Sequence, residues 1–362
     1  MALKLVRQLS TDSLHENLLV SPLCVQLALS IAMNASDGQT RSEIGALLGI
    51  SPTEMVSTNR MNAELVRSLS RPGAGIQLSV ANSLWADNAV EVRKQFAELC
   101  RKDYLATVTR LDFSNPEAPS TLNRWASKAT RVLVQQMVER VDPLTVAMLT
   151  SAMFFRGKWA MPFSPKYTTP GVFHLIDGSR VERQMMQHCA EFACLASDSF
   201  RAVALPFAGR RFLLYVFVPN DTLGLPDFLE KLDSDNWHRW LSEFRTEEIV
   251  VRLPRFSVAS NLDLASALVC LGVTSAFDPS RADFAPMVAK SPLPVWLGSA
   301  TSKSLLEVDE AGARAATVMA LGAVSGCPDE VIADRPFFVA LWDSATQAML
   351  LAGTIYNPLQ PN

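Results

Sequence analysis

Hydrophobic and polar positions predict helices in the first part of the chain and mainly strands in the rest. Helical patterns cover residues 23–33, 54–69, 91–102 and 120–138, and Thr40-x-x-Glu43 matches a capping box ahead of Ile44, Leu47 and Leu48. Runs typical of strands cover 76–86, 147–155, 202–207, 211–218, 248–253, 337–342 and 348–356. Because helices precede strands instead of alternating with them, the pattern indicates an α+β fold with large antiparallel or mixed sheets.

The segment from Glu307 to Pro328 fits neither pattern. It reads EVDEAGARAATVMALGAVSGCP, and after Glu310 its only charged residue is Arg314. Alanine favours a helix, but three glycines interrupt the segment and two valines favour a strand. A conformation for this segment cannot be assigned from local preference alone.

Composition and charge exclude several classes of function. The 362 residues can bury a large core and could form about two domains, but no linker, repeat or low-complexity tract divides them. A net charge of −3 gives no reason to expect nucleic acid or an anionic membrane as a partner. The basic pairs Arg93-Lys94 and Arg101-Lys102 are interpreted as solvated helix faces, not as a heparin-like or nucleic-acid site.

The N-terminal segment and the cysteines favour an intracellular protein. No apolar run reaches the about 18–20 residues of a membrane span, and charged residues interrupt the first segment too often for a secretory signal. Six cysteines are too few for a disulfide scaffold in a chain of this length. We therefore expect a cytoplasmic location, with secretion by an unconventional route as the alternative.

A search for catalytic chemistry finds nothing above background. The four histidines form no HExxH motif, and GxSxG, a phosphate-binding glycine loop and CxxC are all absent from the sequence. A zinc site at His188, Cys189 and Cys194 would lack a fourth ligand, so these residues are interpreted as structural. We expect no catalytic residues, no metal and no cofactor.

An ordered series of short motifs extends over the whole chain instead. In sequence order the motifs are Asn17-x-x-Val20-Ser21-Pro22, Ala28-Leu29-Ser30, Gly38-x-Thr40-x-x-Glu43-Ile44, Ala81-Asn82-x-Leu84-Trp85, Leu122-Asn123-x-Trp125, Phe155-Arg156-Gly157-Lys158-Trp159, Leu205-Pro206-Phe207, Leu253-Pro254-Arg255-Phe256, Leu271-Gly272-Val273 and Arg335-Pro336-Phe337. In this order and at these spacings they resemble the serpins, a family of serine protease inhibitors, over about residues 1–359.

The resemblance implies a fold and a mechanism. It implies one domain over residues 1–362, three β-sheets, eight or nine helices, and an exposed reactive-centre loop at about 310–334. It also implies a metastable monomer that acts as a suicide substrate. A protease cleaves the loop, and the loop then inserts as a new central strand of the large sheet and traps the protease as a covalent acyl-enzyme. The serpin is therefore the substrate of its target and not an enzyme.

The segment from Glu307 to Pro328 has the properties that a loop needs in order to insert into a sheet. Residues 312–326 contain no proline, which would remove a hydrogen bond from a central strand. Successive side chains of a strand point to opposite faces of the sheet. If Ala313 faces the interior of an inserted strand, Arg314 faces solvent, so its charge need not be buried. The resemblance assigns the hinge to Glu310, Gly312, Ala313, Arg314, Ala315, Ala316 and Thr317, and it makes Arg255 the ionic partner of Glu310.

The scissile bond has two possible positions. Counting forward from Glu310 by the family's spacing gives Gly326–Cys327, whereas counting backward from Pro336-Phe337 gives Ser325–Gly326. No Lys or Arg lies between residues 315 and 334, so we expect an elastase-like or subtilisin-like target that accepts small residues, or else a cysteine protease. Cys327 could make the loop sensitive to oxidation, but a thiol without a role is the simpler interpretation.

Other positions depart from the family pattern. Serpins usually carry Thr and Glu after the hinge glycine, where this chain has Ala313 and Arg314, and Val318 and Met319 are bulkier than the usual alanines. A non-inhibitory serpin that acts as a binding protein or chaperone is therefore the alternative. The polar cluster that helps the large sheet to open is also altered, and the sheet-opening region of this chain comprises Ser21, Cys24, Ser151, Trp159 and Ser302.

Overall fold

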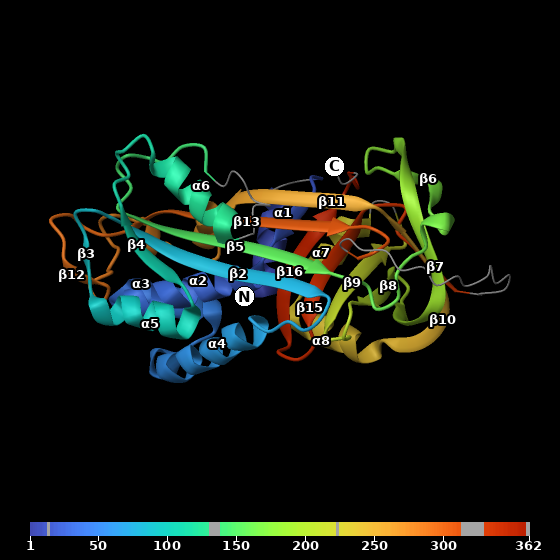
Figure 1. The fold of residues 1–362 in the computed structure, drawn as a ribbon, viewed down its shortest axis with the longest axis horizontal. Helices are drawn as coiled ribbons and strands as arrows, with labels where there is room; N and C mark the ends of the chain where they lie inside the picture. Colours follow the sequence, from blue (N-terminus) through green and yellow to red (C-terminus); the bar gives the residue numbers. More distant parts are fainter. Residues whose placement is uncertain (13–14, 130–137, 222–223, 313–328, 360–362) are drawn as a thin grey trace.

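The computed structural model describes residues 1–12, 15–129, 138–221, 224–312 and 329–359. Its strands form three sheets within these ranges, as the family resemblance implied. The five-stranded sheet has the order β11 (Phe256–Asp263), β13 (Leu297–Val308), β5 (Ala147–Gly157), β2 (Ile76–Asp87) and β4 (Thr107–Leu111). It runs along the long axis of the molecule (Figure 1).

The remaining strands form a nine-stranded sheet and a two-stranded sheet. The nine-stranded sheet has the order β1 (Leu18–Val20), β16 (Ala348–Ile355), β15 (Phe337–Asp343), β9 (Phe212–Pro219), β8 (Phe200–Pro206), β7 (Arg180–Ala196), β10 (Arg245–Pro254) and β14 (Glu330–Ile332), with β6 (Thr169–His174) paired to β7. The two-stranded sheet joins β3 (Glu91–Val92) to β12 (Val288–Lys290).

Helices cover both faces of the five-stranded sheet. The α-helices of the described ranges are α1 (Ala2–Asp12), α2 (Pro22–Ala35), α3 (Gly38–Leu48), α4 (Met55–Leu69), α5 (Lys94–Tyr104), α6 (Ala118–Ala129), α7 (Gly224–Glu230), α8 (Ser234–Glu243) and α9 (Ala265–Cys270). Helix α6 lies over one face of β2 and β5, where Trp85, Leu122 and Met148 form a small apolar cluster (Figure 1). Helix α2 is buried along most of its length and contacts the other face. Strand β5 is therefore covered on both sides.

The capping box predicted at Thr40 and Glu43 is wrong. Helix α3 begins earlier, and its N-cap is Asp37, which accepts a hydrogen bond from the Gly38 amide at 2.9 Å. Both predicted capping residues serve distant parts of the chain instead. The Thr40 hydroxyl accepts from the Asp283 amide at 3.0 Å, and the Glu43 carboxylate accepts from the Ser275 amide at 2.7 Å.

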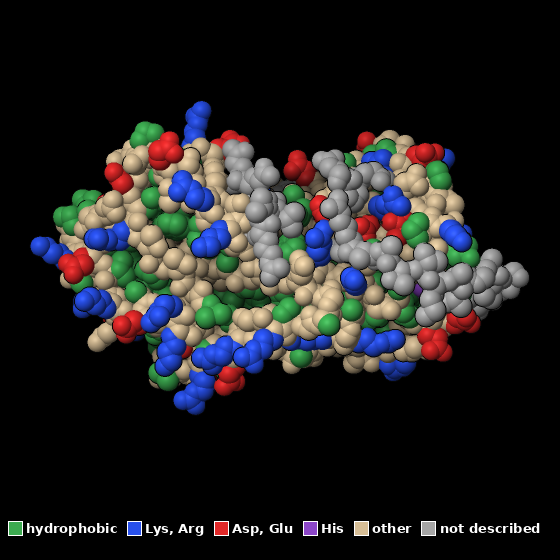
Figure 2. Space-filling model, viewed as in Figure 1, with side chains coloured by type: hydrophobic (Ala, Val, Ile, Leu, Met, Phe, Trp, Pro, Cys, Tyr) green, Lys and Arg blue, Asp and Glu red, His purple; other side chains and the backbone are tan. Residues whose placement is uncertain are grey.

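Two predicted helices have different bounds in the structure. Within the predicted helix 91–102, residues Glu91–Val92 form β3, because they pair with β12, and the helix begins only at Lys94. The predicted helix 120–138 corresponds to α6, which ends at Ala129, and residues 130–137 lie outside the described residues. The basic pairs of this region are exposed, and Lys and Arg side chains gather on the side of the molecule where α4 and α5 lie (Figure 2).

Candidate functional site

Strands β5 and β13 lie side by side at the centre of the five-stranded sheet. They are parallel, and their paired residues run from Ser299 opposite Met148 to Leu305 opposite Phe154. Strand β11 pairs with the other edge of β13 in the antiparallel sense. We call the β5–β13 junction the seam. The chain leaves the sheet at the end of β13 and enters the segment that the family resemblance predicts to be a reactive-centre loop.

The interior side of the seam is small and polar. Asn82 of β2, Ser151 of β5 and Ser302 of β13 lie opposite one another in a row across the sheet, and all three are buried. Ser304 is buried one step further along β13. The Oδ1 atom of Asn82 and the Oγ atom of Ser304 have no hydrogen-bond partner among the described residues. Because serines bury little apolar surface and two polar atoms are unpaired, this part of the seam gains little from remaining closed.

The N-terminus of α2 contacts the same part of β5. Ser21 is the N-cap of α2 and accepts from the Cys24 amide at 3.1 Å, while its hydroxyl donates to the Leu350 carbonyl of β16 at 2.7 Å. The Cys24 sulfur lies 3.9 Å from the carbonyl oxygen of Ala152, the neighbour of Ser151. Burial raises the pKa of the Cys24 thiol to about 12, so this cysteine stays protonated. The structure thus brings Ser21, Cys24, Ser151 and Ser302 together beneath the seam.

A tight turn at Asp309–Gly312 closes the end of the seam. The Trp159 amide donates to the Ala311 carbonyl at 3.1 Å, and the Trp159 indole Nε1 donates to the Asp309 carbonyl at 2.8 Å. The Trp159 ring stacks on Phe207, with 4.3 Å between ring centroids. Trp159, which the sequence analysis assigned to the sheet-opening region, therefore lies at this turn and apart from the cluster beneath the seam.

Glu310 of this turn forms an ion pair with Arg255, as the family resemblance implied. The Arg255 Nε atom donates to Glu310 Oε1 at 2.7 Å, and Thr168 donates to the same oxygen at 2.5 Å. Thr168 could not be predicted as a partner, because it belongs to no motif and lies far from Arg255 and Glu310 in the chain. Burial alone would raise the pKa of the Glu310 carboxyl, but the hydrogen bonds from Arg255 and Thr168 outweigh burial and hold this pKa below its usual value.

Acid is expected to weaken the turn by protonating Glu310. A carboxyl whose pKa is lower in the folded state stabilises that state fully above its unfolded pKa of about 4.3, and the contribution is lost as the pH falls through the folded value. Arg255→Met should therefore lower the free energy of unfolding by about 1–2 kcal/mol at pH 7, with a smaller loss at pH 3, because Arg255 is partly exposed. Thermal unfolding of both proteins between pH 7 and pH 3 measures this, with Arg252→Met as the control. Parallel pH profiles for wild type and Arg255→Met would contradict the assignment.

Gly312 ends the turn in a conformation that other residues rarely adopt. Its φ is +104°, and a Cβ atom at this position would collide with the carbonyl oxygen of Gly157 and the backbone of Lys158 and Trp159. The rest of the predicted hinge (Ala313, Arg314, Ala315, Ala316 and Thr317), the solvent orientation of Arg314 and the scissile residues Ser325, Gly326 and Cys327 lie outside the described residues.

The residues considered for zinc binding, His188, Cys189 and Cys194, all lie on β7. Within the described ranges, no three His, Cys, Asp or Glu side chains are close enough together to hold a metal ion. The His188 ring lies edge-on to Phe163, and its Nδ1 is 3.0 Å from the carbonyl oxygen of Pro162. Burial lowers the pKa of His188. None of the described helices is long and apolar enough to cross a membrane.

Comparisons with known proteins agree with this architecture. A family model described as serpin (serine protease inhibitor) matches residues 1–358. Alpha-1-antiproteinase of Callosciurus caniceps is 28% identical over 363 residues, which cover 99% of this chain and 87% of that protein. Serpin-ZX of Arabidopsis thaliana is 28% identical over 377 residues, which cover 97% of this chain and 94% of that protein. The solved complex of thyroxine-binding globulin with thyroxine has a TM-score of 0.91 at 22% identity and covers 99% of this chain and 97% of that one. Because the family model spans nearly the whole chain, this protein belongs to the serpin family.

Proposed function

We propose that this serpin is a suicide-substrate inhibitor of a protease that accepts small residues. The loop is cleaved at Ser325–Gly326 or Gly326–Cys327, and the part before the cut inserts into the seam between β5 and β13. The inserted loop then carries the acylated protease to the opposite end of the serpin, where the active site of the protease is distorted and the acyl bond is no longer hydrolysed. The observation that carries this proposal is the parallel, directly paired seam with the loop attached at its end.

The direction of the two seam strands favours insertion. A segment that turns back after β13 runs antiparallel to β13, and because β5 is parallel to β13 it runs antiparallel to β5 as well. Insertion therefore replaces one parallel ladder with two antiparallel ladders, which are slightly more stable per residue. The turn at Asp309–Gly312 already reverses the chain at the entry point.

The length and composition of the loop match the seam. Residues 313–326 span about 46 Å when extended, whereas the 11 residues of β5 span about 36 Å. The inserted segment would therefore extend along the whole seam and move its cut end to the far end of the sheet. Its alanines are small enough to enter beside Ser151 and Ser302 without large rearrangement of the core.

The preferred target follows from the residues near the cut. No Lys or Arg lies between 315 and 334, which argues against a trypsin-like protease. Ala323, Val324 and Ser325 suit the shallow pocket of an elastase-like or subtilisin-like enzyme, and a papain-like cysteine protease is the second class to test. In each case the partner is held as a covalent acyl-enzyme.

A panel of proteases tests the proposal. The intact protein is incubated with elastase-like, subtilisin-like and papain-like proteases, and the products are separated on a denaturing gel. We expect a covalent complex with at least one of them. Thr317→Pro should be cleaved at the same bond without forming the complex, because proline removes a ladder hydrogen bond from the inserted strand. Val324→Ala, a small-residue change near the cut, is the matched control and should still form the complex.

A serpin that binds a ligand or protein without inhibition would give a different result. Ala313, Arg314, Val318 and Met319 depart from the usual loop, and thyroxine-binding globulin has the same fold. In that case all the proteases would cleave the loop cleanly, and the cleaved protein would melt at the same temperature as the intact protein. That outcome would overturn the proposed inhibition.

A further inference from the structure

A groove of about 750 Å³ lies where β4, α5 and the two-stranded sheet of β3 and β12 meet. Figure 1 shows these elements at one end of the molecule and β6, β7 and β10 at the other. Strand β4 pairs with the part of β2 that ends at Asp87, whereas the turn at Asp309–Gly312 lies beside Lys158, at the other end of the five-stranded sheet. The groove is therefore separate from the turn where the loop begins.

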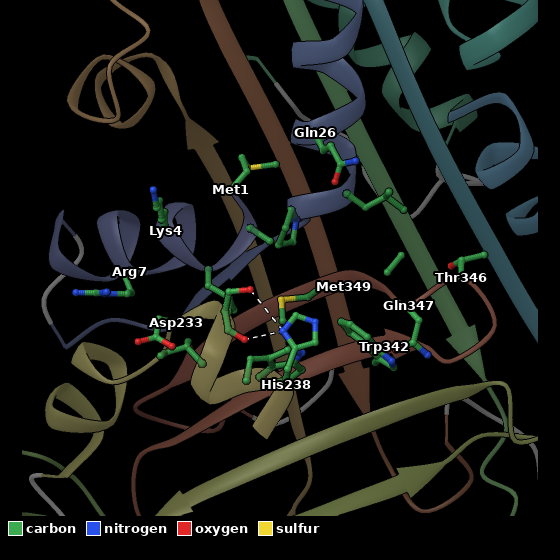
Figure 3. Close-up of a pocket in the computed structure, with 18 of the residues that line it drawn as sticks. Met1, Lys4, Arg7, Gln26, Asp233, His238, Trp342, Thr346, Gln347 and Met349 are labelled. Atoms are coloured by element: carbon green, nitrogen blue, oxygen red, sulfur yellow. Dashed lines mark hydrogen bonds between the residues drawn. The ribbon is translucent and has the colours of Figure 1, made fainter. Parts of the chain in front are cut away.

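The groove differs in chemistry from the cavity of about 380 Å³ that is shown in Figure 3. That cavity lies between α1, α2, α8 and the hairpin of β15 and β16, and Trp237 and Trp342 line it. None of the described residues that line the groove is aromatic, so a ring compound would have no ring to stack on there. Recognition in the groove must therefore come from charges and from backbone groups.

The outer edge of β4 forms one wall of the groove. Val108, Thr109 and Arg110 are consecutive residues of β4, and all three line the groove. Successive side chains of a strand point to opposite faces of a sheet, so three consecutive residues meet one groove along the edge of the strand. Among the strands that the structure describes, β4 pairs only with β2, and its other edge presents unpaired N–H and C=O groups. The groove can therefore accept another extended segment beside β4.

Cations from three different elements line the groove. Lys94 begins α5, Arg110 belongs to β4, and Lys290 ends β12. All three are exposed, and none of them forms an ion pair with a described residue. Glu91 supplies the single carboxylate of the lining, so three cations face one anion. Figure 2 shows Lys and Arg side chains at this end of the molecule.

Helix α5 adds to the positive potential of the groove. Its first residue, Lys94, lines the groove, and its first turn contains no acidic residue. The N-cap residue Arg93 makes no side-chain capping bond. The positive end of the helix dipole is therefore not compensated by the helix itself. An anionic group in the groove would be attracted by the side chains and by this helix end together.

The arrangement of the cations indicates which kind of segment fits. A basic residue on an edge strand usually keeps other chains from pairing with that edge, and Arg110 alone could serve this purpose. Lys94 and Lys290 belong to other elements and line the same groove, so they are placed to contact the side chains of a bound segment. A segment with carboxylates would be attracted to an edge that repels basic segments.

We propose that this groove binds an extended acidic segment of a partner protein, which joins the five-stranded sheet as a strand beside β4. Backbone hydrogen bonds to β4 hold the segment, and its carboxylates contact Lys94, Arg110 and Lys290. Because the groove lies away from the turn, the partner can remain bound while a protease engages the loop. The site does not depend on cleavage of the loop, so a failure of the inhibition assay leaves it unchanged.

Binding of a labelled acidic peptide to the intact protein tests the site. The probe is Glu-Val-Glu-Val-Glu, acetylated at one end, amidated at the other and labelled with fluorescein, and fluorescence anisotropy measures its binding. We expect saturable binding that weakens as salt is added, because exposed charges are screened. A Lys-Val-Lys-Val-Lys peptide should not bind. The acidic peptide should also slow the hydrogen exchange of residues 107–111, because it pairs with β4.

A second peptide separates strand pairing from attraction between charges. The same acidic sequence, methylated at every backbone nitrogen, keeps its carboxylates but cannot donate a backbone hydrogen bond. It should bind at least about 5-fold more weakly than the unmodified peptide. If both peptides bound equally, or if tripolyphosphate displaced the peptide and exchange at 107–111 did not change, the groove would be a site for compact anions. Either result would overturn strand addition.

Matched variants test the position of the site. Lys94→Gln/Lys290→Gln should weaken binding of the acidic peptide about 4- to 20-fold, because it removes two of the three cations. Arg101→Gln/Lys102→Gln removes the same charge from the last turn of α5, which does not line the groove, and should bind as the wild type does. All four side chains are exposed, so both variants should fold. Equal weakening in the two variants, or no saturable binding to the wild type, would overturn the site.

Discussion

Replacing Gly312 with valine is expected to destabilise the native state strongly while leaving an inserted strand almost unaffected. The left-handed backbone of Gly312 costs a valine about 1–3 kcal/mol, and the collision of its Cβ with backbone atoms at 157–159 adds about 1–3 kcal/mol. Valine also favours strands, so the inserted form does not suffer in the same way. We expect a lower melting temperature of the intact protein, a changed Trp159 fluorescence and a faster loss of the native form on storage.

Gly73 provides the matched control for this change. Its φ is +100°, close to that of Gly312, but nothing lies within 4 Å of a Cβ built there. Gly73→Val should therefore show the conformational cost without the collision, and its effect on melting should be clearly smaller. Equal losses of stability in the two variants would show that the contact with Gly157 and Trp159 does not hold the turn.

Replacing Asp343 with alanine is expected to lower the free energy of unfolding by about 3 kcal/mol, since it leaves the partly buried Arg211 guanidinium without its carboxylate partner. Arg211 Nε and Nη2 each donate to the Asp343 carboxylate at 2.7 Å, and the Asp343 side chain is 0% exposed. Arg211 also donates to the Ser68 carbonyl at 3.2 Å, so the pair joins β9 and β15 to the end of α4. Denaturant unfolding at neutral pH measures the loss.

An exposed pair and a compensating variant complete this test. Asp329 pairs with Arg201 at 3.6 Å, and both side chains are about half exposed, so Asp329→Ala should cost less than about 1 kcal/mol. The double variant Arg211→Met/Asp343→Leu removes both charges and should recover part of the lost stability. If Asp343→Ala proved as mild as Asp329→Ala, the pair would not join these elements as described.

The pattern of apolar residues predicted the strands whose two faces are both covered. Strand β5 is an apolar run in the sequence because α6 covers one face and α2 the other. Strand β13 was not predicted, because LGSATSKSLLEV places serines and a lysine where an apolar strand would have Val or Ile. Pairing with β5 and β11 makes this segment a strand, and that information is not local.

The candidate site shows the same division between local and distant information. The pairing of Glu310 with Arg255 followed from the family resemblance, whereas Thr168, the third member of that group, carries no sequence signal. The cluster of Ser21, Cys24, Ser151 and Ser302 was also expected from the family pattern. The Asn82 Oδ1 atom beside this cluster has no hydrogen-bond partner among the described residues. This could not be predicted, because it depends on the exact positions of the neighbouring strands in the assembled sheet.

On the proposed mechanism, strand β14 limits how long the intact protein keeps its native form. The loop is joined at one end to β13 and at the other to β14, which has three residues and pairs with β10. On the proposed mechanism, an uncut loop can fill the seam only after β14 has separated from β10. The time for which an uncleaved molecule keeps its native form then depends on three residue pairs between β10 and β14, at the edge of the nine-stranded sheet. It does not depend on the large core. Ageing of a stored sample would accordingly proceed without any change in covalent structure.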